Sequence, residues 1–137
     1  MPLVRIDHPS GKPAAYRDAL SEGVYEAMRS TFAVPEDDRF LILSGHSSTG
    51  IVRPDSYLGI PYSNELIVIQ ITCNDTRSLE QKKALYAAIA DRLSNKPGLR
   101  REDILISLVE VKRENWSFGN GVAQYAQWRQ GRRCVTR

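Results

Sequence analysis

A proline follows the initiator methionine in the opening string MPLVRIDH, and its position gives it unusual chemistry. A small second residue usually lets the initiator methionine be removed, which would leave Pro2 as the amino terminus. Its nitrogen would then be a ring-constrained secondary amine. A free α-amino group titrates near ~7.7–8, and desolvation lowers that pKa whereas a nearby carboxylate raises it. Pro2 is therefore the first candidate for an acid or base that works near neutral pH.

The protonation state of Pro2 decides which chemistry it would perform. A neutral Pro2 would be a general base that removes a proton from the carbon beside a carbonyl and returns it elsewhere, which is tautomerisation. A cationic Pro2 would be a general acid that polarises a carbonyl oxygen and promotes hydration or loss of carbon dioxide. A secondary amine can also form an iminium with a carbonyl substrate. The sequence leaves these three routes open.

Composition and charge limit the classes of protein to which this chain can belong. The net charge of +3 owes much to a basic C-terminal tail, residues 129–137, which holds four arginines, so we expect no nucleic-acid partner. Cys73 and Cys134 lie far apart, and neither His8 nor His46 falls at ligand spacing with them, so we expect no metal site. A reduced, cytoplasmic protein follows from the cysteine usage. No apolar run reaches the ~20 residues of a membrane helix, and because Arg5 and Asp7 are charged we expect no signal-peptide apolar region at the start.

Hydrophobic periodicity predicts two strand-helix-strand units. Alternation indicates strands, and apolar residues at helical spacing indicate helices, the second of which begins at Ser78 with a capping box to Gln81. Residues 47–64 are expected to be a loop, with a short edge strand around Ile51 and Val52. We expect strands at 2–7, 39–46, 65–73 and 102–111, helices at 13–32 and from 78 to just before Gly98, a turn at 115–121 and a short final element at 122–130.

The spacing of these elements repeats and defines the fold class. From Leu3 to Phe40 is 37 residues, and from Leu66 to Ile104 is 38. Two right-handed β-α-β units, at about 2–46 and 65–111, would form an α/β (α+β) fold with a four-stranded mixed sheet and two helices on one face. A single domain would span residues 1–128, with the tail after it.

The second face of the sheet has no helix to cover it. The strands are apolar on both sides, as Val68 with Ile69 and Ile104 with Leu105 show, and we expect even the short apolar strand 39–46 to be buried on both faces. An oligomer that packs sheet faces together would bury this surface.

Several strings resemble the tautomerase superfamily, and within it the subgroup of malonate semialdehyde decarboxylase. These strings are MPLVRID at the start, VPEDDRF before the second strand, RSLEQK at the start of the second helix and, most specifically, ENWSFGNGVAQY near the end. The resemblance covers roughly residues 2–128. It implies a homotrimer and an enzyme that needs no metal or organic cofactor.

The resemblance also assigns roles to individual residues. Pro2 matches the catalytic N-terminal proline. Asp38 matches the acidic residue that orients a water or the substrate, with Asp37 beside it as the alternative register. Arg77 matches the arginine that holds the substrate carboxylate. Trp116 and Phe118 match aromatic wall residues that would exclude water and strengthen electrostatic interactions.

One position departs from the subgroup pattern. The decarboxylases have an arginine two positions before the one matched by Arg77, and here that position is Asp75. The change favours a different reaction or a transfer of the second cationic role to another arginine. Arg39 and Arg53 are the candidates, and we expect Arg39 to bind substrate.

These observations lead to one main functional expectation and two alternatives. The main expectation is an isomerase or decarboxylase (a carbon-carbon lyase) in which Pro2 acts on a small oxo carboxylic acid such as malonate semialdehyde. The first alternative is keto-enol tautomerisation of a 2-oxo acid such as phenylpyruvate. The second is a trimeric binding protein without catalysis. His46 is interpreted as a structural or exposed histidine, and Tyr57 and Tyr62 on the loop receive no role.

Overall fold

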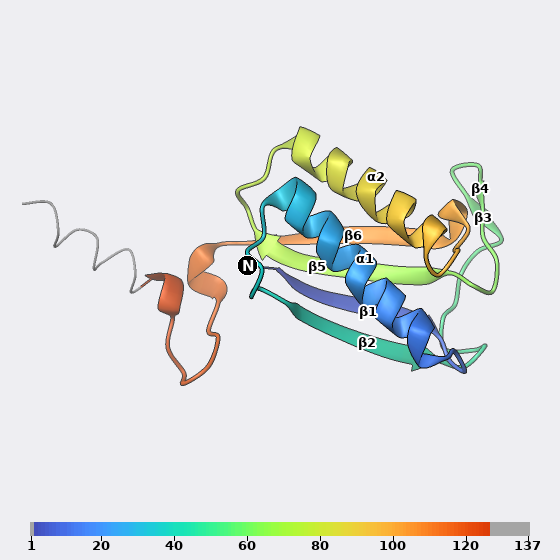
Figure 1. The fold of residues 1–137 in the computed structure, drawn as a ribbon, viewed down its shortest axis with the longest axis horizontal. Coiled ribbons are helices and arrows are strands. Elements are labelled where there is room, and N and C mark those ends of the chain that lie inside the picture. The colour runs from blue at the N-terminus through green and yellow to red at the C-terminus, as the bar shows by residue number, and fades with distance from the viewer. Residues whose placement is uncertain (1, 127–137) are drawn as a thin grey trace, which may run out of the picture.

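A single mixed β-sheet forms the centre of the computed structural model, which describes residues 2–126 (Figure 1). Its strands are β1 (Leu3–Pro9), β2 (Phe40–His46), β5 (Ile67–Asn74) and β6 (Ile104–Val111). The strand order is β2-β1-β5-β6. β1 is parallel to β2, β5 is parallel to β6, and the two middle strands, β1 and β5, are antiparallel. The predicted mixed sheet of two β-α-β halves is confirmed.

Two helices, α1 (Ala14–Phe32) and α2 (Leu79–Asn95), cover one face of the sheet, as predicted (Figure 1). Each helix connects two parallel neighbouring strands, and the two units run in opposite directions on either side of the sheet centre. Right-handed crossovers therefore bring both helices to the same face. The buried stripes that they turn towards the sheet include Leu20, Val24 and Met28 on α1 and Leu85, Ile89 and Leu93 on α2.

The core lies between the helices and the inward face of the sheet. Alternate residues of the middle strands, such as Ile6 on β1 and Ile69 on β5, are buried against the helices. Gly23 lets the helices approach each other closely, because a Cβ at this position would lie 2.7 Å from Leu93 Cδ2. A side chain at position 23 would therefore force Leu93 to move.

The start of α2 has the capping box that the sequence predicted. The Ser78 hydroxyl accepts a hydrogen bond from the Gln81 backbone N–H at 3.2 Å, and the Gln81 side-chain oxygen accepts one from the Ser78 N–H at 2.9 Å. Two backbone donors that the first turn would leave unpaired are thereby satisfied.

Replacing Ser78 with alanine is expected to lower the free energy of unfolding by about 1 kcal/mol, because it removes this cap. Urea denaturation at a fixed protein concentration measures the change. Ser94→Ala is the matched control, since the Ser94 hydroxyl only donates to the Ala90 carbonyl inside the same helix. We expect the control to change stability by less than about 0.5 kcal/mol. Equal losses in the two variants would contradict the capping interpretation.

β2 differs from the expectation that it is buried on both faces. It is an edge strand, and Phe40 and Ile42 on the face away from the helices remain 51% and 41% exposed in the single chain. Leu41 and Leu43, which point the other way, pack on the core. The prediction is therefore wrong for the isolated chain, because apolar residues on both sides of a strand need two covering layers and this chain supplies one.

The loop between β2 and β5 also differs from expectation. The short strand is not at Ile51 and Val52. A two-stranded hairpin, β3 (Ser56–Tyr57) with β4 (Ile60–Pro61), forms a few residues later. Gly59 provides the positive φ of +76° that its tight turn requires.

Short irregular elements lie before and after β6. Two 3-10 turns, η1 (Arg101–Asp103) and η2 (Arg113–Asn115), lie on either side of β6, and residues 124–126 are helical. The rest of the expected final element, the basic tail and the processing of Met1 lie outside the described residues. Within residues 2–126, none of the helices has the length and apolar character needed to cross a membrane.

Candidate active site

The sheet register brings Pro2 to one end of the sheet. Leu3 pairs with Phe40 on β2 and with Thr72 on β5. Continuing the antiparallel register places Pro2 beside Cys73, near the end of β5. Pro2 is buried, and α1 ends and α2 begins at this same end of the molecule (Figure 1).

The segment between α1 and β2 positions Asp38. The chain leaves α1 through Ala33 in a left-handed conformation, with φ at 53°. The Tyr25 hydroxyl then donates to the Glu36 carbonyl, which fixes the segment against α1. Asp37 is exposed whereas Asp38 is half-buried, so Asp38 is the carboxylate that turns inward.

Electrostatic interactions connect Asp38 with the amino terminus and with Arg77. Burial raises the pKa of Asp38, and the positive charges of the amino terminus and of Arg77 act in the opposite direction. Burial also raises the pKa of the Cys73 thiol, and the same two positive charges oppose that shift. Asp38 and Arg77 thus share one electrostatic neighbourhood at the end of the sheet where the register places Pro2, although the three residues are separated by dozens of residues in the sequence.

Arg77 lies in the turn between β5 and α2. Its guanidinium donates to the Phe32 carbonyl at 3.2 Å and to the Thr76 hydroxyl at 3.3 Å. It also stacks over the Phe32 ring, with Cζ 4.8 Å from the ring centroid. These neutral partners orient the guanidinium without cancelling its charge, so Arg77 can still attract a carboxylate.

Aromatic side chains from the segment after β6 form a wall. The Trp116 indole N–H donates to Asn74 Oδ1 at 2.8 Å, which fastens the wall to the end of β5. The Trp116 and Phe118 rings stack with centroids 5.4 Å apart. Phe118 in turn meets the edge of Tyr125 at 5.0 Å. This wall continues the site beyond the two aromatic residues that the sequence indicated.

Tyr125 is a site residue that the sequence analysis did not assign, although it ends the ENWSFGNGVAQY string. Burial raises the pKa of the Tyr125 phenol, the Asp38 charge raises it further, and Arg113 and Arg77 oppose the shift. The Phe118 backbone N–H donates to the Gln124 side chain at 3.0 Å, which holds the segment in a compact turn. Tyr125 therefore joins the group around Asp38 and Arg77.

Replacing Asp38 with asparagine is expected to lower the pKa of Tyr125. The Asp38 negative charge disfavours the phenolate, so its removal makes ionisation of the phenol easier. Removing the Arg77 charge should raise the same pKa. A pH titration of the phenolate absorbance, corrected with a Tyr125→Phe variant, measures both shifts. Asp37→Asn is the control, and a Tyr125 pKa equal in the Asp37 and Asp38 variants would contradict this arrangement.

The two arginines considered as a second cation lie elsewhere. Arg39 forms an ion pair with Glu22 and lies over the Tyr25 ring, with Cζ 4.4 Å from the centroid, so its guanidinium faces α1. Arg53 donates to Asn64 at 2.9 Å in the loop at the opposite end of the sheet. Asp75 is exposed, and its N–H donates to the Val111 carbonyl at 3.2 Å. Arg113, which acts on Tyr125, is another positive charge near the site.

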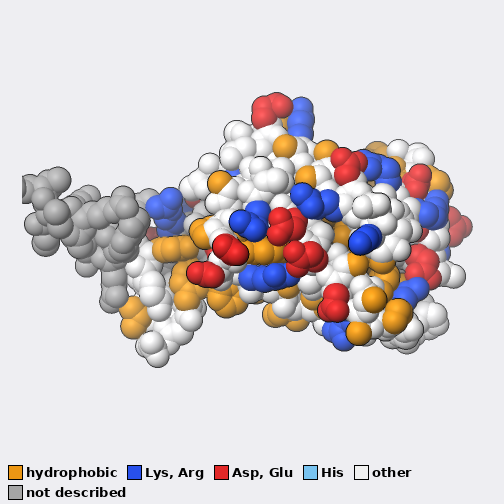
Figure 2. Space-filling view, in the orientation of Figure 1, with side chains coloured by type: hydrophobic (Ala, Val, Ile, Leu, Met, Phe, Trp, Pro, Cys, Tyr) orange, Lys and Arg blue, Asp and Glu red, His pale blue; other side chains and the backbone are white. Residues whose placement is uncertain are grey.

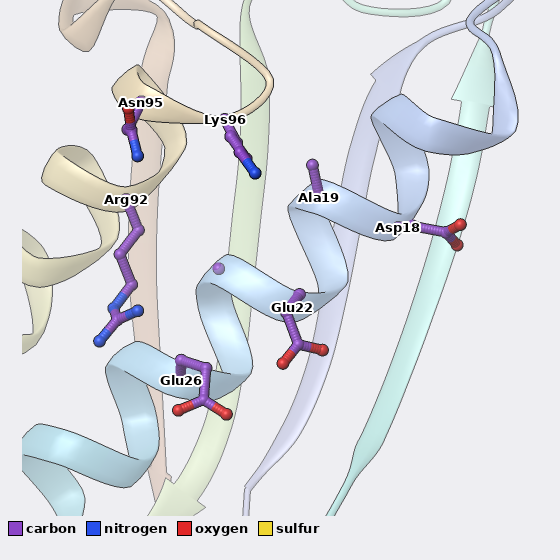
Figure 3. Close-up of a pocket in the computed structure, with 8 residues that line it drawn as sticks. Asp18, Ala19, Glu22, Glu26, Arg92, Asn95 and Lys96 are labelled. Carbon is purple, nitrogen blue, oxygen red and sulfur yellow. The ribbon is translucent and has the colours of Figure 1, made fainter.

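A cavity lies away from this site, in the groove between α1 and α2. It has a volume of about 420 Å³ and is lined by acidic residues of α1, including Glu22 and Glu26, by Arg92 of α2 and by Lys96 directly after that helix (Figure 3). Charges of both signs are also interspersed over the surface around the helices (Figure 2). Within residues 2–126, no group of three or more histidine, cysteine, aspartate or glutamate side chains is arranged to hold a metal ion.

The chain belongs to the tautomerase family, because residues 38–119 match the family model described as a tautomerase enzyme. It is 39% identical to the probable tautomerase YusQ of Bacillus subtilis (strain 168) over 124 aligned residues. The alignment covers 90% of this chain and 98% of YusQ.

Solved structures agree with this assignment. The FG41 malonate semialdehyde decarboxylase inhibited by 3-bromopropiolate is 33% identical, with a TM-score of 0.85 over 93% of this chain and 96% of that chain. A fused 4-OT described as a symmetric trimer shares the fold at 19% identity, with a TM-score of 0.74 over 90% of this chain and 98% of that chain. The chain is therefore a tautomerase-superfamily enzyme with structural neighbours among the malonate semialdehyde decarboxylases.

Proposed function

We propose that this enzyme uses the Pro2 nitrogen as an acid or base on small oxo carboxylic acids and resembles malonate semialdehyde decarboxylase in its reaction. The shared electrostatic neighbourhood of Asp38 and Arg77, at the end of the sheet where the register places Pro2, is the observation that supports this proposal most strongly. The 33% identity to a malonate semialdehyde decarboxylase supports the choice of substrate class. We also place the enzyme in the cytoplasm. Cys73, which lies in the part of the chain that the structure describes, has a free thiol, as expected in a reducing compartment.

Arg77 would bind the substrate carboxylate. Its guanidinium is oriented by Phe32 and Thr76 and carries a charge that these neutral groups leave available. Charge-assisted hydrogen bonds to a carboxylate would hold the reacting carbon at a fixed distance from Pro2. Trp116 and Phe118 would exclude water from the remaining side of the substrate.

In the decarboxylation, cationic Pro2 would donate a hydrogen bond to the C3 carbonyl oxygen of a 3-oxo acid. The bond between C2 and the carboxylate carbon breaks, carbon dioxide leaves, and the electron pair of that bond forms the enol, whose oxygen takes the proton. Asp38 would stabilise the cationic form of Pro2, because a nearby carboxylate favours a positive charge. The enol then becomes the aldehyde as C2 takes a proton and the enol oxygen returns its proton to Pro2.

Keto-enol tautomerisation of a 2-oxo acid such as phenylpyruvate is the alternative, and Asp75 favours it. A carboxylate replaces the second arginine of the decarboxylase pattern, so the positive charge available to a departing carboxylate is smaller. In this reaction neutral Pro2 removes a proton from C3 and delivers it to the oxygen of C2, which becomes the enol hydroxyl. The aromatic wall formed by Trp116, Phe118 and Tyr125 would accommodate the phenyl group.

We also propose that the enzyme is a homotrimer. The sheet face opposite the helices leaves Phe40, Ile42 and Leu105 between 38% and 51% exposed, and a second copy of this chain would bury them. The fused 4-OT with the same fold is described as a symmetric trimer, which supports an assembly of three subunits. Light scattering or sedimentation at several concentrations would measure the assembly.

Measuring two reactions side by side tests the proposed function. We expect carbon dioxide release from malonate semialdehyde to exceed the ketonisation of phenylpyruvate enol in kcat/KM. The reverse order would favour the tautomerase alternative. A protein that accelerates neither reaction, and no other small oxo acid in a panel, would support a trimeric binding protein without catalysis. The pH-rate profile then shows whether the Pro2 limb belongs to an acid or to a base.

A further inference from the structure

The internal duplication creates a second end of the sheet that is equivalent to the Pro2 end. Leu3 opens β1 and Ile67 opens β5, so the residues before them, Pro2 and Leu66, hold equivalent positions. The antiparallel register that places Pro2 beside Cys73 also places Leu66 beside Pro9. The hairpin of β3 and β4 marks this second end, opposite the amino terminus (Figure 1).

A cavity of about 210 Å³ lies at this second end. Pro9 and Leu66 line it, as the register requires, together with residues from the loop that follows β2. Its polar lining includes the side chains of Ser10, His46, Ser47, Ser48, Arg53 and Asn64. Several hydroxyl groups and a guanidinium around a volume of this size would suit a ligand of a few heavy atoms that accepts hydrogen bonds.

We infer that this cavity is a binding site for a small carboxylate, which it holds without chemical conversion. Arg53 is the main reason. Its side chain is only 20% exposed, and its guanidinium donates to Asn64 Oδ1 at 2.9 Å and to the Pro54 carbonyl at 3.2 Å. Both acceptors are neutral, and they hold the guanidinium in one orientation at the cavity wall.

The carboxylates near this cavity leave the Arg53 charge available. Asp55 is 3.9 Å from the Arg53 guanidinium but is fully exposed, so water screens its charge. Asp7 accepts a hydrogen bond from His46 Nε2 at 2.6 Å, which directs that carboxylate to the histidine and fixes the imidazole ring. Asp103 is engaged by the Ser63 N–H and hydroxyl at 2.7 and 2.5 Å.

The position equivalent to Pro2 explains why the bound carboxylate would not react. The nitrogen of Leu66 is a peptide amide that donates to the Ser63 carbonyl at 3.3 Å, so it has no basic lone pair and no transferable proton. The second end therefore has a cationic side chain for binding but lacks the amine. This inference does not depend on the reaction proposed for Pro2.

Titration with malonate, a small unreactive dicarboxylate, tests the inference. By calorimetry and amide NMR we expect two binding sites per chain, with shifts at residues 46–53 for the second. Arg53→Gln should weaken the second site by about 10- to 100-fold and keep the enzymatic rate unchanged. Arg77→Gln should remove the first site only. Malonamide, which has the same shape without charge, should bind neither site.

Two further variants keep the test decisive. Ser48→Leu is designed to fill the cavity without altering the Arg53 hydrogen bonds, so it should also abolish the second site. It keeps the inference testable even if Arg53→Gln unfolds the loop. Arg17→Gln, on the exposed side of α1, is the control for charge and should keep both sites. Absence of malonate-dependent shifts at residues 46–53 in the unaltered protein, or unchanged shifts there in both Arg53→Gln and Ser48→Leu, would overturn the inference, whatever happens at the Arg77 site.

Discussion

Replacing Pro2 with alanine is expected to lower kcat by about 10²- to 10⁴-fold, the range that a positioned acid or base contributes. Alanine would still leave a free primary amine after removal of methionine, but it lacks the ring that fixes the direction of the nitrogen. Pro2 is buried at the sheet end beside Cys73, and the register of β1 sets its place. Steady-state kinetics with the better of the two substrates measures the loss.

A matched control separates this effect from a general effect of losing a proline. Pro13 precedes α1, is exposed, and makes no side-chain cap. Pro13→Ala should keep kcat within about twofold of the unaltered enzyme, since surface substitutions have small effects. A Pro2→Ala protein that keeps the full rate of both reactions would remove the proline from the mechanism.

Replacing Arg77 with glutamine is expected to lower kcat/KM by about 30- to 5,000-fold. This corresponds to about 2–5 kcal/mol, the cost of removing one partner of a buried, hydrogen-bonded charge pair. Glutamine can still donate to the Phe32 carbonyl, so the loss reports mainly on the missing charge. KM should rise if Arg77 binds the substrate carboxylate equally in the ground state and the transition state.

Two further variants, one at Arg77 itself and one at Arg92, define what this result means. Arg77→Lys keeps the charge but loses the planar fork, so it should recover part of the rate. Arg92 lies in the groove between the helices, away from Pro2, and Arg92→Gln should leave kcat/KM unchanged (Figure 3). Equal rates in the Arg77→Gln and Arg92→Gln proteins would exclude a role for Arg77 in substrate binding.

The architecture could be predicted from the sequence because its signals are local. The buried stripe of Leu85, Ile89 and Leu93 recurs every four residues, and the Ser78 cap marks where that helix begins. The repeated spacing of the two units then predicts two pairs of parallel strands, each pair connected by a helix. Each of these patterns lies within a short stretch of chain.

Features that depend on distant partners could not be predicted in the same way. Phe40 and Ile42 are apolar whether they face a core or a second copy of the chain, so the exposure of β2 has no sequence signal. Arg39 turns to Glu22 on α1, a choice that depends on how the helix packs. The β3–β4 hairpin has strands of two residues, too short for a periodic pattern.

In the candidate site, too, some residues could be predicted from the sequence and others needed the structure. Motif resemblance indicated Pro2, Asp38 and Arg77, and the structure brings these three residues to one end of the sheet. Tyr125 needed the structure, because its relation to Asp38 depends on how the chain turns back after Phe118. A tyrosine in a short string with glycines and glutamines has no feature that distinguishes it from a surface residue.

The intact mass of the active enzyme, as produced in cells, tests the central claim most directly. A basic or acidic nitrogen at Pro2 requires that no residue precede it, since an amide nitrogen has no usable lone pair. We predict a mass that lacks the initiator methionine, with the first cycle of N-terminal sequencing giving proline. Full activity in a protein that retains Met1 would contradict the account.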